Sequence, residues 1–152
     1  MREVLLLRHG QAEGIHPAAA LLVEGEAQAQ QVAEHLNPWV QKGLEVVSSP
    51  YPRAKETARL IAARWGLMPL SPLPELIPEG DERVAREALE GLGVDGPLLV
   101  VSHRPLLPRL TQRLAGVLAP FPTAGGVVLE LDDWAPQGAR MTYWLDPTGV
   151  QR

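Results

Sequence analysis

The chain has 152 residues, of which 45% are hydrophobic and 21% charged, and its formal net charge is −4, all typical of one soluble globular domain. Because cysteine is absent, disulfides, thiolate catalysis and cysteine-based metal sites are excluded, and the acidic charge balance argues against nucleic acid as a partner. No stretch has the pattern of a signal peptide or the length of a membrane span, so we expect a cytoplasmic protein.

The first predicted element is a buried strand that runs directly into Arg8 and His9. Four apolar residues, Val4–Leu7, precede this pair and Gly10 follows it. A short apolar run bounded by a glycine is typical of a strand in the middle of a parallel sheet. Open α/β sheets place their ligand sites at the carboxyl ends of such strands. Gly10 would allow a sharp turn there or the close approach of a ligand.

Two helices and a second strand follow. Apolar residues at helical spacing predict a helix over 24–36, which Asn37-Pro38 ends. A strand over 44–48 then leads into a helix over 52–65 that begins with proline, a favoured residue in the first helical turn. Arg53 therefore lies at a helix N-terminus, where free N–H groups and the helix dipole favour a bound anion.

The middle of the chain is rich in proline. A short strand is expected at 69–71, and the connection over 72–78 is too broken by proline for regular structure. A helix over 81–90 follows, with acidic residues at its N-terminus as the helix dipole favours.

The last third of the chain contains a second apolar strand that ends in a histidine and an arginine. The elements predicted here are a strand, a helix and two further strands, over 97–102, 105–115, 126–132 and 140–145. The first of these strands delivers His103 and Arg104 at its carboxyl end. A short turn joins the last two strands, so we expect an antiparallel hairpin at one edge of the sheet.

The order of strands and helices predicts a three-layer α/β/α fold with a mostly parallel central sheet and one antiparallel edge strand. Parallel strands would bring Arg8, His9, Arg53 and His103 to one edge of this sheet. Arginine guanidinium groups match phosphate oxygens, so the expected ligand is a phosphate. One histidine can be neutral and attack phosphorus, while the other can be protonated and hold the charge of the phosphoryl group.

Several segments resemble the motifs of the histidine phosphatase superfamily, which has the phosphoglycerate mutase-like fold. They are Arg8-His9-Gly10, the block from Ser48 to Ala58, and Ser102-His103, in the order that the family has. The segment Leu21–Ala29 is also similar to the family, although Leu22 stands where a helix-capping threonine is usual.

The resemblance implies a role for each residue of the expected phosphate site. His9 would be the nucleophile and become transiently phosphorylated. Arg8, Arg53 and His103 would bind the phosphoryl group and stabilise its charge during transfer, without a metal or another cofactor. Arg104 stands where the family usually has a small or apolar residue, and we expect it to bind substrate by adding positive charge at the mouth of the site.

The family also uses an acid after the third strand as a proton donor to the leaving group. Glu75 stands at the matching place, and Glu79 and Asp81 are the alternatives. Only about five residues separate Glu75 from the next predicted helix, so residues 1–152 are expected to form one domain without the lid insertion of larger family members.

The size of the chain and the segment Leu73–Asp81 resemble the SixA-type phosphohistidine phosphatases. This resemblance implies an enzyme that removes phosphate from phosphohistidine on phosphotransfer proteins. The alternatives are a broad-specificity phosphomonoesterase of the same superfamily, acting on small phosphate esters, and a non-catalytic module that binds phosphate or phosphoproteins. Neither a nucleic acid nor a membrane is an expected partner, and the oligomeric state stays open.

Overall fold

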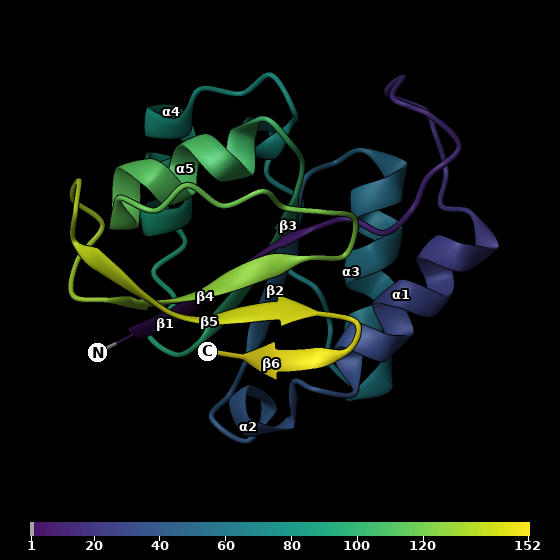
Figure 1. Cartoon of the computed structure of the whole chain (residues 1–152), viewed down its shortest axis with the longest axis horizontal. Helices are drawn as coiled ribbons and strands as arrows, with labels where there is room; N and C mark the ends of the chain where they lie inside the picture. The colour runs from purple at the N-terminus through teal and green to yellow at the C-terminus, as the bar shows by residue number, and fades with distance from the viewer. Residues whose placement is uncertain (1) are drawn as a thin grey trace.

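The computed structural model describes residues 2–152 (Figure 1). The strands are β1 (Arg2–Arg8), β2 (Glu45–Ser48), β3 (Leu98–Ser102), β4 (Gly126–Leu131), β5 (Ala139–Asp146) and β6 (Gly149–Gln151). The helices are α1 (Val23–Ala33), α2 (Asn37–Val40), α3 (Pro52–Arg64), α4 (Glu82–Gly91) and α5 (Leu106–Ala115), with a 3-10 turn η1 (Pro74–Leu76). Across residues 2–152, none of the helices has the length and hydrophobicity that crossing a bilayer requires.

The strands form one sheet in the order β2-β3-β1-β4-β5-β6. β1 and β2 each pair in parallel with β3, whereas β4 pairs antiparallel with β1 and with β5, and β5 pairs antiparallel with β6. The predicted α/β fold is confirmed, but the sheet is mixed rather than mostly parallel with one antiparallel edge strand. The difference arises because β4 lies inside the sheet and pairs antiparallel with β1, and because a short turn after β5 adds β6 as a further antiparallel strand.

Helices cover both faces of the sheet, which gives the predicted three layers. Val4 and Leu6 of β1 pack in a core with α4 and α5, while Leu5 and Leu7 pack in a second core with α1 and α3. Figure 1 shows these two helix pairs on opposite sides of the strands. Because both faces of β1 are covered, its sequence is apolar at successive positions instead of alternating with polar residues.

The helix predicted over 24–36 ends three residues early, and a second, short helix follows it. α1 ends at Ala33, and Asn37-Pro38 begins α2 instead of ending the first helix. Proline is compatible with a first helical turn, so the same dipeptide can begin a helix as well as end one. Leu22 is the N-cap residue of α1 and gives it no side-chain cap, as its apolar side chain implies.

The proline-rich segment runs beside β2 without forming the strand predicted at 69–71. The N–H of Leu73 donates to the carbonyl of Ser48 (3.0 Å), which holds the segment against the end of β2. The next residues form η1, in the connection that we expected to be irregular. The hydroxyl of Ser102 donates to the carbonyl of Leu76 (2.7 Å) and fixes η1 at the end of β3.

Gly10 lets α1 approach the end of β1. A Cβ atom at Gly10 would lie 2.5 Å from the carbonyl oxygen of Gly25, and a Cβ at Gly25 would collide with the backbone of Gln11. The space beside Gly10 is therefore filled by the first turn of α1. In this structure the glycine serves helix packing, whereas the sequence suggested close approach of a ligand.

Candidate active site

The carboxyl ends of β1, β2 and β3 meet at one edge of the sheet, as predicted. In the β1–β3 pairing Arg8 lies beside Ser102, so the two strands end at the same level. The residues that follow the three strands, His9, Ser49 and His103, therefore share this edge. All three are buried, because loops and the start of α3 cover the strand ends.

The ring of His9 is held in one orientation and one neutral tautomer. Its Nδ1 lies 2.7 Å from the carbonyl oxygen of Gly10, and since a carbonyl only accepts, Nδ1–H is the donor. Nε2 then carries the lone pair, toward which Nε–H of Arg53 points at 3.3 Å. Burial, together with the charges of Arg8 and Arg53, outweighs the Gly10 hydrogen bond and lowers the pKa of His9 to about 4. The imidazole is therefore neutral near pH 7, with its electron pair at Nε2, where Arg53 donates to it.

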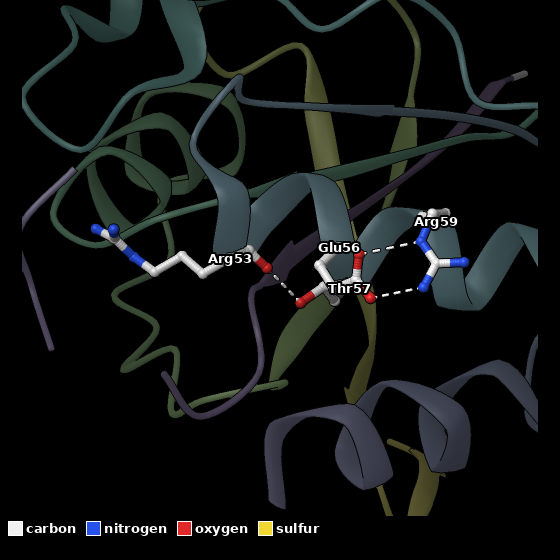
Figure 2. Close-up of polar contacts among 4 residues, drawn as sticks. All are labelled: Arg53, Glu56, Thr57 and Arg59. Carbon is white, nitrogen blue, oxygen red and sulfur yellow. Dashed lines mark hydrogen bonds and ion pairs between the residues drawn. The ribbon is translucent and has the colours of Figure 1, made fainter. Parts of the chain in front are cut away.

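Arg53 is buried in the first turn of α3 and keeps an uncompensated charge. Its Nη1 donates to the carbonyl of His16 (3.0 Å). Figure 2 shows its side chain extending away from the ion pair that Glu56 and Arg59 form on the same helix. Because Glu56 is engaged by Arg59 at 2.6 Å, it does not neutralise Arg53.

Arg8 and Arg104 add positive charge beside Arg53. Arg8 is half-buried and donates from Nη1 to the carbonyl of Phe121 (3.3 Å), and its Nε is buried without a hydrogen-bond partner among residues 2–152. Burial and the charges of Arg104 and Arg53 lower the pKa of Arg8. In the part of the chain that the structure describes, no ion pair involves these three arginines. A bound anion would relieve their mutual repulsion.

His103 lies next to His9, with ring centroids 5.1 Å apart. Its Nε2 is 2.6 Å from the hydroxyl oxygen of Ser49. Burial and the charges of His9, Arg53 and Arg8 lower the pKa of His103 to about 3. The ring is therefore neutral near pH 7, whereas the sequence analysis expected that the second histidine can be protonated. The physical reason is that this ring is buried beside other cationic groups.

Thr57 connects the end of β1 to α3, and the sequence analysis gave it no role. Its hydroxyl accepts from the N–H of Gly10 (3.1 Å) and donates to the carbonyl of Arg53 (2.7 Å), the latter drawn in Figure 2. This contact fixes Arg53 relative to His9. The four-residue spacing between Arg53 and Thr57 puts both on one face of the helix, which is a signal that the sequence contained.

Tyr51 is a second residue that the sequence analysis did not assign to the site. Its ring meets the ring of His103 edge-on at 5.2 Å, and the guanidinium of Arg53 lies 5.2 Å from the centre of the same ring. Its hydroxyl donates to a carboxylate oxygen of Glu79 (2.9 Å), which raises the pKa of Tyr51. A hydrogen bond to Tyr51 therefore links the exposed Glu79 to the aromatic ring that lies against His103 and Arg53.

The three candidate acids have different surroundings. Glu75 is half-buried in η1, and the hydrogen bonds of residues 2–152 do not connect its side chain to the site. Asp81 is the N-cap residue of α4, where it accepts from the N–H of Arg83 (2.7 Å), and this hydrogen bond lowers the pKa of Asp81. This side chain is therefore used to cap α4, and its hydrogen bond does not lead to the site. Glu79 is therefore the acid that the geometry links to His103 and Arg53.

This arrangement is suited to an attack on phosphorus. A neutral imidazole with its electron pair at Nε2 lies near the guanidinium groups of Arg8 and Arg53 and beside a second imidazole. Positive charge at fixed positions stabilises the oxygens of a transferring phosphoryl group. Within residues 2–152, no group of three or more histidine and carboxylate side chains is arranged to bind a metal ion.

Comparison with known proteins agrees with this geometry. Residues 4–78 match the model of the histidine phosphatase superfamily (branch 1). The matched region contains most of β1 and the whole of α3 and η1, and so includes Arg8, His9, Arg53 and Glu75. None of the curated proteins matches the sequence closely enough to count as a relative.

Solved structures share the whole fold. The protein histidine phosphatase SixA, solved with tungstate, is 26% identical, with a TM-score of 0.82 and coverage of 96% of this chain and 97% of that one. A protein of Agrobacterium tumefaciens assigned to the SixA phosphohistidine phosphatases is 20% identical, with a TM-score of 0.75 and coverage of 95% and 97%. A phosphoserine phosphatase mutant of Entamoeba histolytica is 15% identical, with a TM-score of 0.74 and coverage of 95% and 96%.

The site geometry predicts that Arg53 is required for binding phosphate. Arg53→Gln should weaken the binding of inorganic phosphate by about 10- to 100-fold, because a charged hydrogen-bond donor is lost from a buried site. Isothermal titration calorimetry on the purified chain measures this directly. Arg59→Gln is the matched control, since it removes the same charge from the exposed side of the same helix. Equal losses in the two variants would contradict the assignment.

Proposed function

The chain belongs to the histidine phosphatase superfamily, and from this premise we propose that it is a metal-independent phosphatase that forms a phosphohistidine intermediate on His9. The observation that carries the proposal is the contact between Nδ1–H of His9 and the carbonyl of Gly10. This contact leaves the electron pair on Nε2, the atom that Arg53 faces. A nucleophile of this kind needs no separate base, because it is already deprotonated near pH 7.

The proposed reaction has two steps. In the first, Nε2 of His9 forms a bond to phosphorus while the bond between phosphorus and the leaving group breaks, and the leaving group takes up a proton. In the second, water attacks the phosphorus and gives up a proton to the acid that protonated the leaving group, the bond to Nε2 breaks, and inorganic phosphate is released. Arg8, Arg53 and His103 hold the phosphoryl oxygens in both steps, and positioning with charge stabilisation provides the catalysis.

We propose phosphohistidine on phosphotransfer proteins as the substrate. Only residues 77–81 separate η1 from α4, so the chain has a short connection where larger family members insert a lid. Lids enclose small substrates, and a site without one suits a phosphoryl group displayed on a protein. The similarity to the protein histidine phosphatase SixA supports the same substrate class. The imidazole of phosphohistidine also leaves readily once protonated, so it requires little help from an acid.

A small phosphate ester is the second candidate substrate. The fold is shared with a phosphoserine phosphatase, which favours this alternative. Arg104 is exposed next to His103, and Arg8 is half-buried beside it, so the mouth of the site is positively charged and would attract either kind of substrate.

Turnover rates separate the candidate functions. We predict that the purified chain dephosphorylates a phosphohistidine-carrying phosphotransfer domain with a kcat/KM at least about tenfold above that for phosphoserine or phosphoglycerate, and that His9→Asn abolishes both activities. Release of inorganic phosphate is the readout. A clear preference for a small ester would replace the proposed substrate. Tight phosphate binding without any turnover would instead identify a binding module.

The identity of the proton donor is a separate prediction. Glu79→Gln should slow dephosphorylation of phosphohistidine by about 10- to 100-fold. This is a small rate loss for the removal of a general acid, because imidazole is a good leaving group. Glu75→Gln is the matched control in the same connection and should change the rate by less than about twofold, since the site's hydrogen bonds do not reach its side chain. Single-turnover rates measure both variants. A larger loss for Glu75→Gln would restore the assignment that the sequence suggested.

A further inference from the structure

Ser49 is the one hydrogen-bond partner of the His103 imidazole ring among residues 2–152. Its hydroxyl oxygen lies 2.6 Å from Nε2 of His103, and both side chains are almost completely buried, at 0% and 1% exposed. The other ring nitrogen, Nδ1, is buried without a partner. Since Ser49 occupies Nε2, Nδ1 is the ring nitrogen that remains available to a bound phosphoryl group.

The direction of the Ser49–His103 hydrogen bond follows from the donors and acceptors around Ser49. The N–H of Tyr51 donates to the Ser49 oxygen at 3.2 Å, which uses one of its two lone pairs. The hydroxyl has a single hydrogen, and in the described part of the chain Nε2 of His103 is the acceptor that it reaches. With this direction, Nδ1 of His103 carries a hydrogen that has no acceptor among residues 2–152.

The opposite direction is less favourable. If Nε2–H donated to Ser49, the Ser49 hydrogen would be buried without an acceptor, and Nδ1 would carry a lone pair. That lone pair would face the oxygens of a bound phosphoryl group and repel them. Because burial keeps His103 neutral near pH 7, the ring has only one N–H, and its location decides whether the ring attracts or repels the ligand.

We propose that Ser49 is a positioning residue that holds neutral His103 in the Nδ1–H tautomer, so that Nδ1–H donates to a phosphoryl oxygen bound at His9. The proposal rests on the proposed function, because it takes the bound group to be a phosphoryl group. It gives the two histidines the same tautomer for opposite purposes. Gly10 accepts from Nδ1 of His9 and frees a lone pair, whereas Ser49 donates to Nε2 of His103 and frees a donor.

The nitrogen NMR spectrum of the histidine side chains tests the proposal on the full-length protein. In the wild type without ligand, His103 should show a protonated Nδ1 and an unprotonated Nε2 at pH 7. Addition of inorganic phosphate should shift the Nδ1 resonance and leave the tautomer unchanged. A protonated Nε2 with an unprotonated Nδ1 would overturn the proposal. The wild-type spectrum alone gives this answer, so the test does not depend on any variant folding or on catalytic activity.

Variants test the consequence for activity. Ser49→Ala should lose the fixed Nδ1–H tautomer and lower kcat by about 10- to 100-fold, with a smaller change in KM, because the donor matters most in the transition state. Ser49→Thr keeps the hydroxyl and should restore most of the rate. Ser48→Ala is the matched control, because Ser48 is the neighbouring buried serine at the end of β2, and its hydroxyl donates to the carbonyl of Ser49 and not to His103.

The outcomes separate the two proposals. An unchanged tautomer and an unchanged kcat in Ser49→Ala would contradict the positioning role of Ser49. The expected tautomer in a chain that binds inorganic phosphate but does not turn over phosphohistidine would contradict the proposed function and leave the role of Ser49 supported.

Discussion

The site depends on one hydrogen bond, from Nδ1–H of His9 to the carbonyl of Gly10. This bond orients the ring and puts the electron pair on Nε2. The carbonyl can accept this hydrogen because Gly10 is itself fixed: its N–H is bound by Thr57, and its Cα lies against Gly25 of α1. The packing of α1 and α3 on one face of the sheet therefore determines the chemistry of a ring at the edge of the sheet.

Burial and positive charge keep the two histidines of the site neutral, while its arginines remain cationic in spite of both effects. The pKa of His9 falls to about 4 and that of His103 to about 3, so both imidazoles are uncharged near pH 7. The guanidinium groups of Arg8 and Arg53 stay charged, because arginine does not lose its proton in proteins. Hydrogen bonds then determine which nitrogen of each neutral ring carries the hydrogen. The carbonyl of Gly10 sets this for His9, and the hydroxyl of Ser49 sets it for His103.

The sequence predicted the parts of this site that local patterns encode. Apolar runs located the strands, and the residues after them located His9 and His103, because a parallel sheet brings its carboxyl ends together. The contacts of Ser49 and Tyr51 could not be predicted in this way, since they join segments that only the folded chain brings within hydrogen-bond distance. The mixed sheet was not predicted for a related reason. The sequence pattern after α5 locates the strands along the chain, but it does not indicate which strand each of them pairs with.

The central claim is that His9 carries the phosphoryl group during turnover. Its most direct test is rapid quenching of the purified chain with a phosphotransfer protein that carries radiolabelled phosphohistidine, followed by mapping of acid-labile label. The account predicts transient label on His9 in the wild type and none in His9→Asn. Release of labelled phosphate without label on His9, or undiminished release by His9→Asn, would contradict it.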